Sequence, residues 1–235
     1  MMQRTNERKR NLREPHRILP LNAVWQKARL LVAAAGFALL GWTATAATDS
    51  VILAGGCFWC VESDFDSVTG VTATTSGYTG GTSSNPSYKS VSAGRGGHYE
   101  AVKVEFDPAQ VSLRTLLDKF WRSIDVTDDG GQFCDRGHSY RTAVFVQDDQ
   151  QRKQAAASKA AAETVLGVPF VTQILDASEF YPAEKRHQNY HLGTNRVVTR
   201  FGVIQQADAY KRYRKGCGRD RRVRELWGKE AAFAH

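Results

Sequence analysis

The sequence predicts one α+β domain of two layers, in which helices pack on a small mixed sheet in a ferredoxin-like arrangement, after an N-terminal signal segment. Short apolar runs typical of strands alternate with longer segments of helical spacing. No internal repeat or linker interrupts this pattern. The chain after residue 46 also has the length of a single domain.

The N-terminal segment has the features of an export signal. Residues 1–29 contain eight Lys and Arg against two Glu, which is +6 of the formal net charge of +8. A mostly apolar run follows at 30–41, and Ala44-Thr45-Ala46 fits the small-x-small pattern of a cleavage site. We therefore expect export and cleavage near Ala46, with an uncleaved membrane anchor as the alternative. Because the basic excess is concentrated here, it does not support nucleic-acid binding.

Four or five strands and at least four helices are expected after this segment. Buried or alternating apolar residues predict strands at 49–55, 71–78, 101–106, 142–146 and 171–175. Apolar spacing and capping residues predict helices at 57–68, 113–124, 148–166, 178–192 and within 195–214. The Gly/Ser/Asn-rich stretch 79–97 and the polar stretch 125–139 are expected to be loops. Loops as long as the first of these are usually functional or disordered.

The strongest chemical signal is Gly55-Gly56-Cys57-Phe58-Trp59-Cys60. A cysteine that follows two glycines at the start of a helix lies beside free backbone N–H groups and the positive end of the helix dipole. Both stabilise a thiolate, so we expect Cys57 to have a lowered pKa and to be nucleophilic. From position alone, a buried structural cysteine or half of a disulfide fits equally well.

A Cys-x-x-Cys pair also fits a thioredoxin-like redox pair or half of a zinc site. A zinc site would need a second pair, and Cys134 and Cys217 each stand alone in the sequence. We therefore expect no metal.

Further motifs follow along the chain in a fixed order. Together with Gly-Cys-Phe-Trp and Val61-Glu62, they resemble the type A peptide methionine sulfoxide reductases over roughly residues 51–192. With the N-terminal pattern described above, we expect a signal peptide or anchor at 1–46, a catalytic domain at 47–195, and a C-terminal helix and basic tail at 196–235 that carries the candidate resolving Cys217. These motifs are Ser76-Gly-Tyr78-Thr-Gly-Gly81, Asn85-Pro-Ser-Tyr88, Gly97-His98-Tyr99-Glu100, Gly137-x-x-Tyr140-Arg141 and Phe180-Tyr181-Pro182-Ala183-Glu184.

The resemblance implies a catalytic role for several residues. Cys57 would attack the sulfoxide sulfur as a thiolate. Glu100 would give a proton to the departing oxygen, and Tyr78 and Tyr140 would donate hydrogen bonds to it. Such a role requires the pKa of Glu100 to be raised by burial. Asp135 would order the tyrosines or assist the later reduction.

Two aromatic residues are expected to hold the substrate methyl group. An apolar aromatic wall suits a methyl that stands beside a polar oxygen. By resemblance, Phe58 and Trp59 would form this wall. Trp59 is the better pocket candidate, and Phe58 has more the character of a core residue.

Attack would leave Cys57 as a sulfenic acid, which a second thiol converts to a disulfide. We prefer Cys217 as this resolving thiol, because it lies between glycines near the C-terminus among many Lys and Arg that favour a thiolate. Cys60 stands where the family commonly has glycine, but a bridge within one helical turn strains the backbone unless the turn distorts. Cys134 is the third candidate, because it adjoins Asp135.

The implied enzyme binds no metal or organic cofactor and takes electrons from thioredoxin or an exported dithiol donor. Its substrates would be the S epimer of methionine sulfoxide in oxidised proteins and in free form. We expect an exported, periplasmic or otherwise extracytoplasmic monomer, with no nucleic-acid partner and with membrane contact only through an uncleaved leader. Two rivals remain: a thiol–disulfide oxidoreductase that uses Cys57 and Cys60, and a non-enzymatic exported domain held by two disulfides.

Overall fold

The computed structural model describes residues 48–234, which lie in one compact unit. The predicted export signal and its cleavage site lie outside the described residues. Within the described part of the chain, no helix has both the length and the apolar character needed to cross a membrane.

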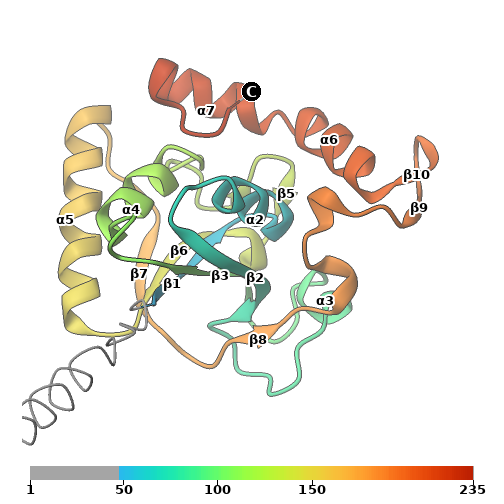
Figure 1. Ribbon diagram of the computed structural model, residues 1–235, viewed down its shortest axis with the longest axis horizontal. Coiled ribbons are helices and arrows are strands. Elements are labelled where there is room, and N and C mark those ends of the chain that lie inside the picture. The colour runs from blue at the N-terminus through green and yellow to red at the C-terminus, as the bar shows by residue number, and fades with distance from the viewer. Residues whose placement is uncertain (1–47, 235) are drawn as a thin grey trace, which may run out of the picture. The chain divides into compact units, whose positions relative to one another are not determined.

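A six-stranded mixed sheet forms the centre of the fold, with the strand order β7-β6-β1-β3-β2-β8 (Figure 1). All neighbouring strands pair antiparallel except β6 and β7, which are parallel. The strands are β1 (Asp49–Gly55), β2 (Val71–Thr79), β3 (Tyr99–Phe106), β6 (Thr142–Val146), β7 (Gln173–Asp176) and β8 (Tyr181–Pro182).

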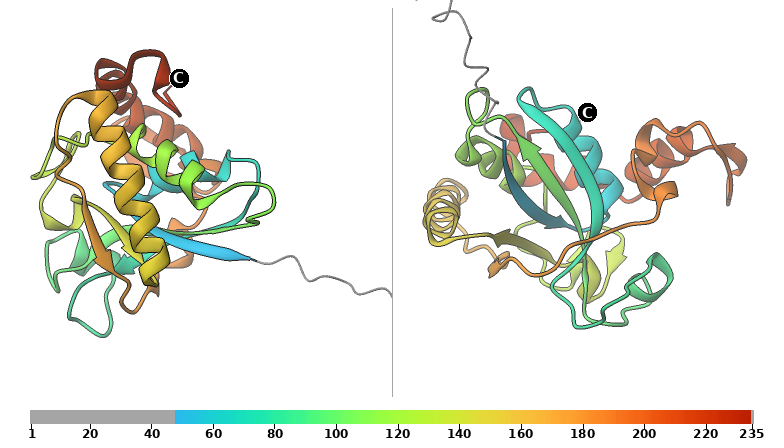
Figure 2. Two further views of the ribbon diagram at one scale, coloured as in Figure 1. Left: turned by 90° about the vertical axis from the view of Figure 1, so that its left-hand side faces the viewer. Right: turned by 60° about the horizontal axis from the view of Figure 1, so that its bottom comes forward.

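Three helices, α2 (Phe58–Asp66), α4 (Leu113–Trp121) and α5 (Asp149–Leu166), pack on the sheet, and α4 lies beside α5 (Figure 2). Alternation along β1 divides the core. Val51 and Leu53 belong to the large cluster that includes apolar residues of all three helices, whereas Ile52 and Ala54 belong to a smaller cluster. Side chains of successive strand residues point to opposite faces, so the helices cover one face and a thinner layer covers the other.

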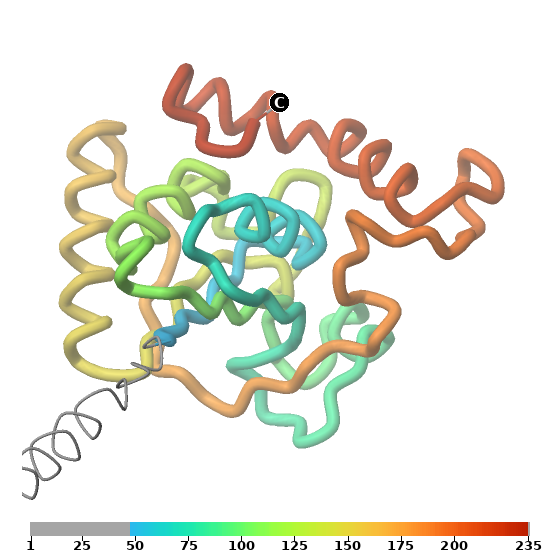
Figure 3. Tube along the Cα trace, viewed as in Figure 1, coloured from blue at the N-terminus to red at the C-terminus, as the bar shows by residue number. Residues whose placement is uncertain are grey.

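The C-terminal extension, residues 196–234, packs against this domain. It contains a hairpin of β9 (Arg196–Thr199) and β10 (Gly202–Gln205), then α6 (Gln206–Gly216) and α7 (Arg219–Trp227). A one-turn 3-10 helix, η5 (Gly228–Glu230), follows. In Figures 1 and 3 the two red helices run across the end of the domain that carries the start of α2. Apolar side chains of α7 and of the segment after it join the main core cluster.

The mixed α+β domain with helices on a mixed sheet is confirmed, and the predicted strands and the first three predicted helices occur close to their expected positions. The predicted loop 79–97 contains a short capped helix, α3 (Tyr88–Val91). The helix predicted within 195–214 begins only at residue 206, because the preceding residues form the β9–β10 hairpin.

The helix predicted at 178–192 is wrong. Tyr181 and Pro182 extend along the edge of β2, and the Ala183 N–H donates to the Ser76 carbonyl. Two one-turn 3-10 helices follow, η3 (Lys185–His187) and η4 (Tyr190–Leu192). The cause is edge pairing: Pro has no N–H for a helical hydrogen bond, but it can end a sheet at its edge.

Candidate active site

Cys57 lies between the end of β1 and the first turn of α2. Gly56 turns the chain there with a φ of +83°, and a Cβ on this residue would lie 2.5 Å from Cβ of Gln132. Cys57 is the N-cap of α2, with a non-helical backbone, and its carbonyl accepts a hydrogen bond from the Cys60 N–H at 3.0 Å. Both thiols are free and buried, and they lie within hydrogen-bonding range of each other.

The two thiols have different acidities. Burial raises the pKa of the Cys57 thiol, and Cys60, Glu100 and Asp135 raise it further. The pKa of Cys60 is lowered, because Cys57 donates a hydrogen bond to it and because Arg219 and Arg214 favour its thiolate. The lowered pKa expected for Cys57 is therefore wrong for the resting site: removal from water and nearby carboxyl groups outweigh the helix N-terminus.

The pKa of Glu100 is shifted in the direction that the sequence interpretation required. It lies on β3 with 2% of its surface exposed, and its Oε2 accepts the Phe58 N–H at 3.2 Å. Burial raises the pKa of Glu100 to about 8, although the Phe58 N–H and the Tyr140 hydroxyl favour the carboxylate. Its Oε1 is buried without a hydrogen bond of good geometry to any residue in 48–234. A protonated carboxyl group can therefore donate into the site at neutral pH.

Two tyrosines lie near the thiol and the carboxyl group. Burial raises the pKa of both Tyr88 and Tyr140, and the charges of Glu100 and Cys57 raise each of them further. Both hydroxyls therefore keep their protons and can donate hydrogen bonds.

Tyr78 is placed differently from the sequence expectation. It is fully buried, and its hydroxyl donates to Oε2 of Glu184 at 2.8 Å. The same carboxylate accepts the Tyr88 N–H at 3.0 Å. Tyr78 and Glu184 thus hold the start of α3 in place. Since the Tyr78 hydroxyl is engaged by Glu184, Tyr88, on which the charges of Glu100 and Cys57 act, is the better candidate for the donor role that the sequence interpretation gave to Tyr78.

Asp135 lies on β5 (Asp135–Arg136), which forms a hairpin with β4 (Gly131–Gln132). Burial raises the pKa of Asp135, and the carboxylate in turn raises the pKa of Glu100. Its Oδ2 accepts a hydrogen bond from the Tyr213 hydroxyl on α6. Asp135 therefore belongs to the electrostatic environment of the thiols and also connects the β4–β5 hairpin to the C-terminal extension.

The two aromatic residues after Cys57 have different surroundings. Phe58 is fully buried in the main core, whereas Trp59 is partly exposed. Trp59 stacks on Tyr190 with ring centroids 3.9 Å apart and meets Tyr213 edge-on at 6.1 Å. It lines a pocket of about 420 Å³ with, among others, Tyr190, Tyr213 and Phe201. This is the division of roles between core and pocket that the sequence interpretation favoured.

The two remaining cysteines are joined to each other. Cys134 and Cys217 form a disulfide across 83 residues of sequence, and both line the pocket beside Trp59. The preferred resolving thiol, Cys217, is therefore not free in this form, whereas Cys60 is. Cys57 has a non-helical backbone as the N-cap of α2, so a Cys57–Cys60 bridge would not lie wholly within regular helix.

The group formed by Cys134, Asp135 and Cys217 is a poor set of metal ligands. Cys134, Asp135 and Cys217 place ligand atoms within 4.8 Å of one another, but the two sulfurs are used in the disulfide.

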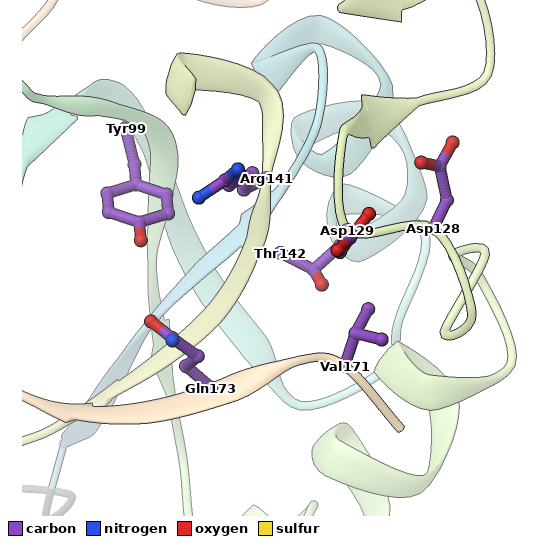
Figure 4. A pocket seen from close by; sticks show the side chains of 7 residues that line it. All are labelled: Tyr99, Asp128, Asp129, Arg141, Thr142, Val171 and Gln173. Atoms are coloured by element: carbon purple, nitrogen blue, oxygen red, sulfur yellow. The ribbon is translucent and has the colours of Figure 1, made fainter. Parts of the chain in front are cut away.

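A separate pocket of about 280 Å³ between Tyr99, Asp128 and Gln173 contains none of the predicted site residues (Figure 4).

The site contains residues that sequence reasoning did not select. Tyr88 and Glu184 stand within motifs that were recognised, so a signal for them existed. Tyr190, Tyr213 and Arg219 had none, because they lie in segments without a recognised chemical motif and reach the site only through tertiary packing.

Comparison with known proteins identifies the family. A family model described as peptide methionine sulfoxide reductase matches residues 49–229. The chain is 45% identical over 205 residues to the peptide methionine sulfoxide reductase MsrA 2 of Caulobacter vibrioides. The aligned region covers 85% of this chain and 98% of that protein. It is 43% identical over 177 residues to MsrA of Bacillus subtilis, with 74% and 93% covered.

Solved structures agree with this result. The fold is similar to Mxr1 from Saccharomyces cerevisiae in its reduced form, with a TM-score of 0.59 and 31% identity over 62% of this chain and 85% of that chain. It is also similar to methionine sulfoxide reductase A of Corynebacterium diphtheriae, with a TM-score of 0.56 and 28% identity over 67% and 84% of the two chains. The chain is therefore an oxidoreductase that belongs to the peptide methionine sulfoxide reductase family.

Proposed function

We propose that this enzyme reduces the S epimer of methionine sulfoxide, in proteins and in free form, through covalent chemistry at Cys57. The observation that carries the proposal is the grouping of the buried Cys57 thiol with a protonated carboxyl group, Glu100, and two tyrosine hydroxyls, Tyr88 and Tyr140. The thiol supplies a nucleophile, and the other three groups supply a proton and hydrogen bonds to an oxygen atom.

In the first step, the sulfoxide oxygen lies among these three donors. Transfer of the Glu100 proton to that oxygen leaves positive charge on the substrate sulfur, and this charge lowers the pKa of the adjacent Cys57. The resulting thiolate attacks the substrate sulfur. The oxygen then moves from the substrate sulfur to Cys57: the substrate S–O bond and the transient bond between the two sulfurs break, and the proton released by Cys57 returns to Glu100. Methionine sulfur is thereby reduced by two electrons, and Cys57 sulfur is oxidised to a sulfenic acid.

In the second step, Cys60 resolves the sulfenic acid. Its thiol is free and lies beside Cys57. The sulfur–sulfur bond forms as the S–O bond of the sulfenic acid breaks, and the oxygen leaves as water with the proton that Cys60 contributed. This choice replaces Cys217, whose sulfur is joined to Cys134 in the structure.

Electrons then enter through the outer cysteine pair. Cys134 is exposed, whereas Cys57 and Cys60 are buried, so an external dithiol protein reaches the outer pair more easily. We propose that reduced Cys134 and Cys217 exchange with the Cys57–Cys60 disulfide, and that a thioredoxin-type donor then reduces the Cys134–Cys217 disulfide. Both exchanges move two electrons from dithiol to disulfide.

The place of action is proposed from the sequence. The basic segment, the apolar run and the Ala44-Thr45-Ala46 motif support export, and an exported enzyme needs an extracytoplasmic dithiol donor. Determination of the N-terminus of the mature protein from fractionated cells tests this proposal. An N-terminus at Met1 on soluble protein in the cytoplasmic fraction would contradict it.

The activity is tested with N-acetylmethionine-S-sulfoxide and dithiothreitol as the reductant. We expect methionine formation from the S epimer and little from the R epimer. Cys57→Ser should reduce the rate by at least about 10³-fold, because it removes the nucleophile. Cys134→Ser is the matched control and should keep most of the activity with this small reductant.

The rival thiol–disulfide oxidoreductase is favoured by one observation, the pair of free thiols at positions 57 and 60. It predicts reduction of an insulin disulfide without sulfoxide turnover. That result, or substantial sulfoxide turnover by Cys57→Ser, would contradict the proposed function.

A further inference from the structure

Arg219, the first residue of α7, is buried and only partly neutralised. It has 2% of its surface exposed, and its Nη1 donates to the Gly55 carbonyl at 3.2 Å. Its guanidinium lies 4.8 Å from the centre of the Phe133 ring. Nε and Nη2 are buried and make no hydrogen bond with any other residue in the described range 48–234. Burial of a guanidinium without full hydrogen bonding costs desolvation free energy, so the buried position of Arg219 requires a physical explanation.

Neutralisation of Asp64 is not a sufficient reason. Arg214 already holds this buried carboxylate, with its Nη1 at 2.6 Å from Oδ1. Nε of Arg219 lies 3.9 Å from Oδ2 of Asp64, beyond hydrogen-bonding distance. Arg214 is also balanced by Asp220, at 2.8 Å from its Nη2. Of the two buried guanidinium groups, Arg214 is hydrogen-bonded to both carboxylates, whereas Arg219 has no carboxylate within hydrogen-bonding distance.

The loosely paired guanidinium of Arg219 lies close to the segment that carries the two thiols. Asp64 follows Cys60 by one helical turn on α2, so both side chains lie on one face of that helix. The Gly55 carbonyl, which Arg219 binds, stands two residues before Cys57. Cys60, the residue that we assign to the second step, therefore shares a helix face with the carboxylate that Arg219 approaches, and the charge of Arg219 acts on Cys60.

We propose that Arg219 is a positioning residue for the resolving step, in which its charge favours the thiolate of Cys60 and so speeds attack on the Cys57 sulfenic acid. This inference rests on the proposed function. The reaction is the one already written: the sulfur–sulfur bond forms, the S–O bond breaks and water leaves. The first step does not need Arg219, because Glu100, Tyr88 and Tyr140 serve the sulfoxide oxygen.

The pKa of the Cys60 thiol depends on every charged or titratable group that surrounds it. Cys57 and Asp64 face it from α2, Tyr210, Tyr213 and Arg214 from α6, Arg219 from α7, and Glu100 from β3. The two arginines are the cations of this set and favour the thiolate, whereas burial and the charge of Asp64 act against it. Removal of one arginine should therefore raise the pH at which the thiolate forms, and removal of Asp64 should lower it.

The test separates the two steps in one experiment. The full chain carries Cys134→Ser and Cys217→Ser, so that Cys60 is the only thiol left to resolve Cys57. Reduced enzyme is mixed with one equivalent of free methionine-S-sulfoxide without reductant. Methionine formation reports the first step. The lifetime of the sulfenic acid, trapped with dimedone at several pH values, reports the second.

We expect Arg219→Gln to lengthen the sulfenic acid lifetime by about tenfold near pH 7 and to raise the pH midpoint of resolution by about one unit. Methionine formation should stay within about twofold of the parent. Arg219→Lys keeps the charge and should recover most of the rate. Arg224→Gln is the matched control, because Arg224 is an exposed arginine of the same helix, and it should change neither step.

Several outcomes would overturn the inference. One is an unchanged pH midpoint in folded Arg219→Gln, and another is an equal loss of both steps. If Arg219→Gln does not fold, Asp64→Asn carries the test, and a midpoint that fails to move downward contradicts the inference. Absence of methionine formation by the parent enzyme would instead count against the proposed function.

Discussion

Two regions of this molecule contribute to one site in contrasting ways. The sheet with α2 carries Cys57, Cys60 and Glu100 on apolar elements, in motifs that identify their chemistry locally. The C-terminal extension is dominated by charged and polar residues, and its sequence suggests a solvated tail. Yet Arg214 and Arg219 are among its most buried side chains, and Tyr213 reaches Asp135.

The difference teaches that polarity along a segment is a poor guide to its burial when the partner surface supplies opposite charge. Asp64 on α2 is buried where the extension packs on that helix, and a buried carboxylate requires a cation. The extension supplies that cation, and with it an electrostatic environment for the thiols. The predictions below test whether the chemistry resides in the first region and its tuning and electron supply in the second.

The largest expected effect belongs to the first region. Glu100→Gln removes the proton donor and should lower kcat/KM by about 10³-fold. In the parent enzyme the acid form is present below a pKa of about 8, so the first step should slow as pH rises through that value. The variant should lose this dependence. Glu105→Gln, at the far end of the same strand, is the control, and equal rates for Glu100→Gln and parent would refute the assignment.

The stability of the second region is tested next. Arg214→Met leaves Asp64 without its closest cation, and we expect a loss of about 3 kcal/mol in the free energy of unfolding. Urea denaturation monitored by tryptophan fluorescence measures this loss. Lys215→Met, at the exposed neighbouring position, should change stability by less than about 0.5 kcal/mol. Equal midpoints for the two variants would show that the extension is dispensable for folding.

Variants of the outer pair, Cys134 and Cys217, separate the supply of electrons from sulfoxide reduction at Cys57. The double variant Cys134→Ser, Cys217→Ser should keep dithiothreitol-supported turnover within about twofold of the parent, because this small dithiol can reach the inner pair. Turnover supported by a thioredoxin-type protein should fall by about tenfold, since the exposed pair is lost. Equal losses with both reductants would contradict a relay through the outer pair.

The smallest expected effects come from two tyrosines in the first region. Tyr88→Phe removes a donor to the sulfoxide oxygen and should lower kcat/KM by about tenfold. Tyr78→Phe removes a hydrogen bond to Glu184 and should cost about 1 kcal/mol of stability, with a smaller effect on activity. A larger catalytic loss for Tyr78→Phe than for Tyr88→Phe would reverse the roles that we assign.

The central strands and the helices α4 and α5 could be predicted from the sequence, because alternation and helical spacing are local patterns. Residues 178–192 show how such patterns fail: their spacing suggested a helix, but pairing of Tyr181 and Pro182 with the edge of β2 decided their conformation. The Gly-Cys-Phe-Trp motif and Glu100 were also recognisable, and the raised pKa of Glu100 follows from the burial of its strand end.

Sequence alone therefore determined the family and indicated Cys57 and Glu100 as the proposed nucleophile and acid, since each depends on residues that stand together in a motif or on one strand. Only the tertiary structure decided that the Tyr78 hydroxyl binds Glu184, that Cys134 pairs with Cys217, and that the buried Arg219 binds the Gly55 carbonyl. These relations join segments far apart along the chain. Their energies depend on distance and on exclusion of water, which are properties of the packed molecule.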